Sequence, residues 1–156
     1  MQPLIVYVGL GSNLGDRRQN IGSAIELLGK TPGLQVLRAA TILENAAVGG
    51  PENSPVFLNT VVEIKTSLSA HALLNRLMQI ESELGRVRRD KWEPRIIDAD
   101  LLLYGNHIFS SQDLIVPHPL MHERRFVLQP LAELAPDVVH PVLQMSIRGL
   151  LDNLVK

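Results

Sequence analysis

The chain has 156 residues, of which 46% are hydrophobic and 20% are charged, and its formal net charge is −1. This length and composition are typical of a globular domain with a sizeable core, so we expect residues 1–156 to form a single domain. The low charge argues against a protein that coats nucleic acid, and the lack of cysteine excludes disulfides and thiolate metal sites. No apolar run approaches the ~20 residues of a membrane span, and the N-terminus has no signal-peptide pattern. We therefore expect a cytoplasmic protein.

The first part of the chain predicts a strand and a helix. Residues 4–8 are apolar and rich in β-branched side chains, which predicts a buried strand that runs into a glycine-containing turn at residues 9–13. Asp16 is suited to cap the helix that follows, because Gln19 stands three residues on, as in a capping box. Apolar residues at helical spacing then continue to a stop at residues 31–33.

The middle of the chain predicts three more strands and a second helix. Residues 34–43, 56–65 and 96–104 have the composition of strands, and Ser69 is suited to cap a helix between the last two. The resulting order of strand, helix, strand, strand, helix, strand is typical of a ferredoxin-like βαββαβ fold of the α/β (α+β) class. We expect both main helices on one face of the sheet and an open opposite face, with residues 105–156 adding short helices and loops.

Alternation within the strands predicts which side chains share a face. In the third strand, Phe57, Asn59 and Val61 point away from the face that carries Leu58 and its apolar neighbours. In the fourth strand the two aspartates are predicted to point away from four apolar residues: Ile97, Ala99, Leu101 and Leu103. Polar and aromatic groups should therefore gather on the open face.

Asp98 and Asp100 are the first candidate site. At i and i+2 in an apolar strand they lie side by side, about 6.5–7 Å apart at Cα. Neighbouring carboxylates repel each other, and a hard cation such as Mg²⁺ relieves that repulsion while also binding substrate phosphates. The alternative is that one aspartate pairs with an arginine and the other reaches solvent. The strand by itself favours neither interpretation.

A basic cluster ahead of the aspartates favours the metal interpretation. Arg86, Arg88 and Arg95 lie within ten residues, with Trp92 among them. Guanidinium groups bind phosphate oxygens in a bidentate way, and metal with arginine is the usual arrangement around a polyphosphate in transfer. A solvated loop is the plain alternative for such a charge run. Pro94 and the turn-forming residues before it predict a loop suited to close over ATP.

Three further patterns are weaker. Phe57 and Asn59 suit a flat heterocycle, the ring by stacking and the amide by hydrogen bonding; the plain alternatives are cross-strand packing for Phe57 and a strand-end hydrogen bond for Asn59. His118 and His122 have the i, i+4 spacing of a zinc pair, but no third ligand follows at motif spacing. The glycines of residues 9–15 match neither the dinucleotide fingerprint nor a Walker A loop, and we expect them to permit a tight turn.

Together these segments resemble the 6-hydroxymethyl-7,8-dihydropterin pyrophosphokinase family of folate biosynthesis, nearly end to end. The most specific segment is residues 92–101, which read Trp-Glu-Pro-Arg-Ile-Ile-Asp-Ala-Asp-Leu. The other matching segments are residues 9–16, Phe57-Leu58-Asn59, Glu81 with residues 85–88, Val116-Pro117-His118-Pro119 and Arg124-Arg125-Phe126.

The resemblance implies an enzyme that transfers pyrophosphate from ATP to the hydroxymethyl group of the pterin and releases AMP. It implies two Mg²⁺ ions on Asp98 and Asp100, with Arg86 and Arg95 as catalytic partners. Contacts with ATP are implied for Arg86, Arg88, Trp92, Arg95, Ile97 and His118. Contacts with the pterin are implied for Ala47, Val48, Gly49, Phe57, Asn59 and Phe126, with the two phenylalanines on opposite faces of the ring. Glu81 and Arg124 would support these groups or the phosphates. We expect a monomer whose partners are ATP and the pterin, without nucleic acid or membrane.

Two other classes of protein share some of these features. An RNA-recognition module has the same element order and also exposes aromatics on an open sheet, but its third-strand motif is absent from residues 55–62. A regulatory domain of the same fold that binds a small molecule without catalysis explains neither the arginine cluster nor the paired aspartates.

Overall fold

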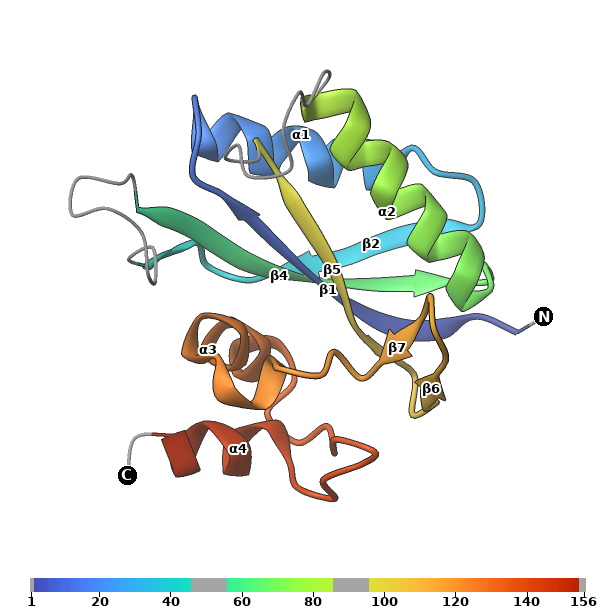
Figure 1. Cartoon of the computed structure of the whole chain (residues 1–156), viewed down its shortest axis with the longest axis vertical. Coiled ribbons are helices and arrows are strands. Elements are labelled where there is room, and N and C mark those ends of the chain that lie inside the picture. The colour runs from blue at the N-terminus through green and yellow to red at the C-terminus, as the bar shows by residue number, and fades with distance from the viewer. Residues whose placement is uncertain (1, 46–55, 86–95, 155–156) are drawn as a thin grey trace.

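A computed structural model describes residues 2–45, 56–85 and 96–154 (Figure 1). Its centre is an antiparallel sheet with the strand order β2-β4-β1-β5, in which β3 also pairs with β4. The strands are β1 (Leu4–Ser12), β2 (Leu34–Ala39), β3 (Leu43–Asn45), β4 (Phe57–Thr66) and β5 (Asp98–Tyr104). Helices α1 (Arg17–Gly29) and α2 (Ala70–Gly85) cover one face. The predicted ferredoxin-like order is confirmed.

The two main helices begin at the predicted caps. Asp16 accepts a hydrogen bond from the backbone N–H of Gln19 at 3.1 Å, and the Ser69 hydroxyl accepts one from the N–H of Ala72 at 3.1 Å. The predicted apolar stripes pack on the sheet in a helix-side core, where each fully buried leucine or isoleucine contributes roughly 1.5–3 kcal/mol. In the described part of the chain no helix combines the length and the hydropathy that membrane crossing requires.

The strand boundaries differ from the prediction by one or two residues in β4 and β5, and by more in the first and second predicted strands. β1 continues through Gly9 and Gly11 to Ser12, so these glycines lie in the strand and not in the turn that follows. The predicted second strand is split into β2 and β3, which pair with opposite halves of β4. At the split, Ala40 still donates a hydrogen bond to the Val61 carbonyl at 2.9 Å. The chain therefore follows β4 through the interruption.

A bulge in β5 changes the faces of its last residues. Tyr7 pairs with Leu103 and Val8 pairs with Leu101, so Leu102 is an extra residue in β5. Leu102 and Leu103 both pack on the sheet face away from α1 and α2. The prediction that Leu103 shares a face with Ala99 and Leu101 is therefore wrong, because an inserted residue reverses the alternation.

The second face of the sheet is open over only part of its area, contrary to the prediction. Figure 1 shows α3 (Arg125–Leu134) and α4 (Ile147–Leu154) stacked below the sheet, on the side opposite α1 and α2. They form a second core with Tyr7, Val61 and the two leucines of the bulge. The 3₁₀ helix η1 (Met121–Glu123) and the hairpin of β6 (Phe109–Ser110) and β7 (Ile115–Val116) connect β5 to α3.

A buried glutamate ties α3 to the covered part of this face. Glu63 of β4 accepts hydrogen bonds from the Tyr7 hydroxyl at 2.7 Å and from Arg38 Nε at 3.0 Å. Arg38 also donates to the carbonyl of Leu134, at the end of α3, at 2.8 Å. The hydrogen bonds from Arg38 lower the pKa of Glu63, although burial opposes them. This network holds the end of α3 against one half of the face, and among the described residues the other half opens into a cleft.

Candidate active site

A cleft of about 610 Å³ occupies the uncovered half of the second face, a size typical of small-molecule sites. Its floor is made by β1, β4 and β5, and its wall by η1 and the start of α3. The lining residues are Gly9, Leu10, Gly11, Asn45, Phe57, Asn59, Thr60, Asp98, Asp100, Leu102, Glu123, Arg124, Arg125, Phe126 and Val127.

Two glycines of β1 lie between the polar groups of its neighbouring strands. Gly11 pairs with Asn59 on one side and with Asp98 on the other, and Gly9 pairs with Asp100. The lack of side chains at these glycines lets neighbouring side chains lie close to the β1 backbone: a β-carbon on Gly9 would stand 3.4 Å from Leu102 Cδ1, and one on Gly11 would stand 2.6 Å from Asn59 Nδ2.

The two aspartates lie on the same strand and both line the cleft, as the alternation predicts. Asp98 is half-buried and Asp100 is exposed. Between them Ala99 points to the helix side, and its backbone N–H donates to the Glu81 carboxylate at 2.8 Å. Glu81 therefore binds the backbone of β5 from the helix side of the sheet and is not among the residues that line the cleft. Two adjacent carboxylates that open onto a cleft fit the hard oxygen ligands that Mg²⁺ prefers.

Asn59 is a buried polar residue with an unused acceptor. It is 8% exposed, and its Oδ1 has no hydrogen-bond partner among the described residues. A buried carbonyl oxygen without a partner costs about 1–3 kcal/mol, and a ligand N–H in the cleft would recover that energy. The side chain is held close to the floor, because a β-carbon on Gly11 would come within 2.6 Å of Asn59 Nδ2.

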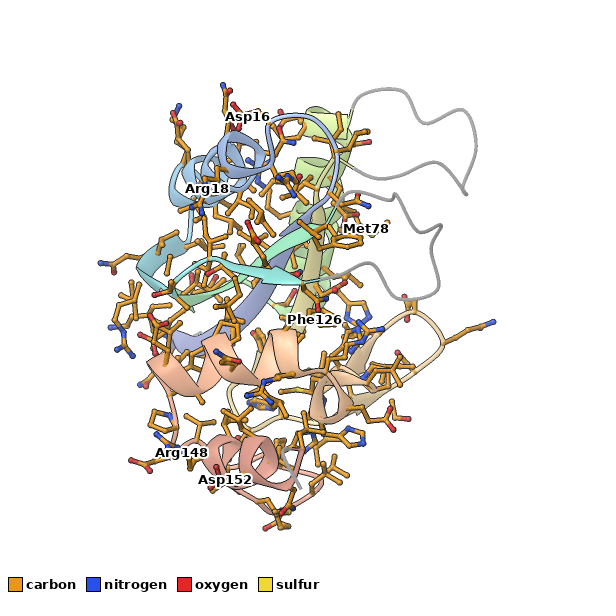
Figure 2. All side chains as sticks on the ribbon, turned by 90° about the vertical axis from the view of Figure 1, so that its left-hand side faces the viewer. Asp16, Arg18, Met78, Phe126, Arg148 and Asp152 are labelled. Carbon is orange, nitrogen blue, oxygen red and sulfur yellow. The ribbon has the colours of Figure 1, made fainter. Side chains whose placement is uncertain are left out.

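Aromatic rings stand at two edges of the cleft. Phe57 is the first residue of β4 and Phe126 is the second residue of α3, and both are half-buried. Figure 2 shows Phe126 between the sheet and α3. The guanidinium carbon of Arg124 lies 5.7 Å from the centre of the Phe126 ring, within the range of a cation–π contact. The structure thus brings both predicted pterin-stacking rings and Arg124 to one cleft.

His118 stands near Asp100 and Arg124 and is oriented by its own backbone. The backbone N–H of His118 donates to the Leu102 carbonyl at 3.0 Å, and the ring Nδ1 accepts from the backbone N–H of Leu120 at 3.2 Å. Burial lowers the pKa of His118; the Asp100 carboxylate opposes this shift, and Arg124 adds to it. A neutral imidazole whose Nδ1 accepts carries its proton on Nε2, so His118 presents one N–H donor.

Several predicted site residues lie elsewhere or outside the described residues. The Ile97 side chain is 1% exposed in the helix-side core, so any contact of Ile97 with ATP must come from its backbone. Residues 2–45, 56–85 and 96–154 contain no group of three or more His, Cys, Asp or Glu side chains that could hold a metal, which gives the zinc alternative no support. Outside the described residues lie Ala47, Val48, Gly49, Arg86, Arg88, Trp92 and Arg95.

Some lining residues carried no sequence signal of their own. Leu102 lies two residues after Asp100 on the same face of β5, Thr60 belongs to β4, and Glu123, Arg125 and Val127 come from η1 and α3, which form the wall. Asn45 reaches the cleft through the pairing of β3 with Phe57. The glycines at positions 9 and 11 were predicted to permit a tight turn, but they lie in β1 and form part of the floor of the cleft.

Residues 7–136 match the family model described as 7,8-dihydro-6-hydroxymethylpterin-pyrophosphokinase. The chain belongs to this family. Membership confirms the resemblance drawn from the motifs and does not favour the RNA-recognition or regulatory alternatives. The region matched contains every described residue of the cleft.

Named relatives come from bacteria and a fungus. The 2-amino-4-hydroxy-6-hydroxymethyldihydropteridine pyrophosphokinase of Bacillus subtilis is 46% identical over 134 residues, which are 86% of this chain and 80% of the relative. The protein of the same name from Aquifex aeolicus is 43% identical over 92% of this chain and 88% of its own length. The folic acid synthesis protein fol1 of Pneumocystis carinii is 42% identical over 96% of this chain but only 20% of its own length.

Solved structures support the fold. The HPPK-DHPS of Plasmodium falciparum, wild type with STZ-DHP, aligns with a TM-score of 0.80 and 15% identity over 97% of this chain. This chain spans 43% of that longer protein. At such low identity the likeness concerns the fold alone, and it agrees with the ferredoxin-like order of the sheet.

Proposed function

We propose that the chain transfers the pyrophosphoryl group of ATP to the hydroxymethyl group of 6-hydroxymethyl-7,8-dihydropterin, and that the cleft between β5 and α3 is where the transfer takes place. The observation that carries the proposal is that one cleft joins a carboxylate pair, a buried unpaired amide oxygen and two aromatic rings. These groups suit the two substrates that the names of the relatives imply, a polyphosphate with its cation and a flat heterocycle.

The pterin half of the cleft is proposed to lie between Phe57, Phe126 and Asn59. The two rings stack on the faces of the heterocycle, and Asn59 Oδ1 accepts a hydrogen bond from its edge. Gly11 of β1 allows the Asn59 amide to lie close to the floor of the cleft, where the ring would meet it. The proposed contacts of Ala47, Val48 and Gly49 complete this half, and they rest on the family resemblance.

The phosphate half is proposed to lie at Asp98, Asp100 and the side chains around them. The two carboxylates would hold two Mg²⁺ ions, which when bound would neutralise phosphate charge. His118 offers a neutral N–H donor beside Asp100, and Arg124 adds positive charge at the mouth of the cleft. Arg86, Arg88, Trp92 and Arg95 are proposed to contact ATP, with Ile97 adding a backbone contact.

In the proposed reaction the hydroxymethyl oxygen attacks the β-phosphorus of ATP. The bond from that phosphorus to the oxygen that bridges to the α-phosphate breaks, AMP leaves with the bridging oxygen, and the hydroxyl proton passes to solvent. The chain contributes alignment and charge, because phosphoryl transfer depends mainly on positioning and electrostatic stabilisation. Glu81 supports the alignment by holding the backbone between the two aspartates.

The proposal is tested by following AMP release from ATP with Mg²⁺, with and without 6-hydroxymethyl-7,8-dihydropterin. The expected result is AMP that forms only when pterin and Mg²⁺ are both present, in equal amount to the pterin pyrophosphate. A folded chain that binds ATP but forms no AMP would refute the proposed activity. Sedimentation of the same sample tests the expected monomer, and cell fractionation tests the expected cytoplasmic location.

A further inference from the structure

Arg17, in the first turn of α1, contacts Val56, the residue just before the cleft-lining strand β4. Arg17 Nη1 donates a hydrogen bond to the backbone carbonyl of Val56 at 2.6 Å. Val56 immediately precedes Phe57, the first residue of β4 and a lining residue of the cleft. Arg17 itself is not among the lining residues, so any effect on a ligand must pass through Val56.

The contact lies where the pairing of β1 with β4 stops. The last pair between these strands is Ser12 with Leu58, so the Val56 carbonyl lies beyond the end of β1. A backbone carbonyl at such a place needs another donor. Arg17 supplies it and so supports the backbone on the side where β1 has ended, while β3 still pairs Asn45 with Phe57 on the other side of β4.

On the other side of β1, where β5 pairs, a side chain also binds a backbone carbonyl beyond the end of the strand pairing. The pairing of β1 with β5 ends at Gly11 and Asp98, and the fully buried Ser12 hydroxyl donates to the Ile96 carbonyl just before β5. Asn20, also in α1, donates to Ser12 Oγ at 3.2 Å. The start of α1 thus supports the first residues of both strands that carry the cleft.

An arginine in this position is unfavourable for the helix alone. The N-terminal turn of a helix carries partial positive charge, so a cation there costs a few tenths of a kcal/mol up to about 1 kcal/mol. The carboxylate of the N-cap residue Asp16, directly before Arg17, offsets part of this cost. The adjacent Arg18 is exposed and makes no hydrogen bond or ion pair with any described residue, whereas Arg17 is half-buried against Val56.

We propose that Arg17 is a positioning residue for the pterin: by holding the Val56 carbonyl it fixes the backbone from which Phe57 stacks on the ring. This inference rests on the proposed function. It assigns Arg17 no contact with either substrate and no part in the phosphate half of the cleft. Loss of Arg17 should therefore weaken pterin binding without changing the chemistry of transfer.

The test compares Arg17→Gln, Arg17→Lys and the matched control Arg18→Gln. We expect Arg17→Gln to raise the KM for the pterin about tenfold, the effect of losing a hydrogen bond from a charged donor, with kcat and the KM for ATP within about twofold. Arg17→Lys keeps a cationic donor and should recover much of the affinity. Arg18→Gln should behave as the wild type. Direct titration of the pterin into each variant should give the same order.

The possible outcomes separate this inference from the proposed function. If the wild type forms AMP and Arg17→Gln matches Arg18→Gln in pterin KM, the positioning role is wrong while the function stands. If Arg17→Gln lowers the melting temperature and kcat but leaves the pterin KM unchanged, Arg17 is only a structural residue and the inference is equally wrong. A wild type that neither binds pterin nor forms AMP overturns the function and the inference together.

Discussion

Gly11 and Asn59 lie so close that a β-carbon on Gly11 would stand 2.6 Å from Asn59 Nδ2. Such a distance is too short for a carbon–nitrogen contact, so Gly11→Ala must push the amide away from its place beside the floor of the cleft. We expect Gly11→Ala to weaken pterin binding by roughly tenfold, the effect of losing about one buried hydrogen bond, with the fold retained. Titration of the pterin into the variant measures the change.

Gly22 is the matched control for this substitution. It lies in α1, and a β-carbon there would meet nothing within 4 Å. Gly22→Ala should leave pterin affinity unchanged and stabilise the helix by roughly 0.5–1 kcal/mol. Equal pterin affinity in the two variants would show that Asn59 does not bind the ring from its present position.

Phe126 offers a test of the two halves of the cleft. Phe126→Ala removes one stacking ring at the start of α3, and we expect pterin affinity to fall about tenfold or more while ATP affinity stays within about twofold. Phe126→Leu keeps apolar volume without the aromatic face and should fall between the wild type and Phe126→Ala. A loss of ATP affinity in place of pterin affinity would contradict the arrangement proposed here.

The alternation of the strands predicted the cleft only in part. It placed Phe57, Asn59, Asp98 and Asp100 on one face correctly, because these positions precede any irregularity in β4 or β5. It failed for Leu103, because nothing in an all-leucine run marks which residue is the extra one. Strand periodicity therefore predicts a face reliably only up to the first bulge.

The packing of helices on the second face of the sheet was harder to predict. Short helices and loops were predicted for residues 105–156 without bounds, and where α3 packs depends on contacts between residues far apart in the chain. Arg38 reaches both Glu63 and the Leu134 carbonyl, 96 positions away. Such long-range contacts have no local pattern, so the size and walls of the cleft emerged only from the structure.

The pH dependence of the free energy of unfolding should include a contribution from His140, and this free energy should fall as the pH drops. His140 is 4% exposed, and its Nδ1 accepts from the N–H groups of Val142 at 3.2 Å and Leu143 at 3.1 Å, which only the neutral ring allows. Burial lowers the pKa of His140, and the nearby His122 adds to this effect. Below its ordinary pKa of about 6.5 the unfolded chain therefore binds more protons than the folded one, so stability falls as the pH drops from 7 towards the lowered pKa.

The measurement for His140 is thermal unfolding between about pH 7.5 and pH 5. His140→Asn keeps an acceptor oxygen at the turn and does not titrate, so its stability should fall less across this range than that of the wild type. His71→Asn is the control, because His71 is an exposed histidine. Parallel pH curves for His140→Asn and the wild type would contradict the role given to burial.

The most direct test of the account is AMP formation by Asp98→Ala and Asp100→Ala in the presence of ATP, pterin and Mg²⁺. Asp152→Ala is the control: Asp152 is an exposed carboxylate on α4, on the opposite side of α3 from the sheet (Figure 2). We predict that each cleft variant stays folded and loses roughly a hundredfold or more in turnover, because the cations that neutralise the phosphates lose a ligand, while Asp152→Ala keeps wild-type turnover. Wild-type turnover in both Asp98→Ala and Asp100→Ala would contradict the assignment of this cleft as the site of transfer.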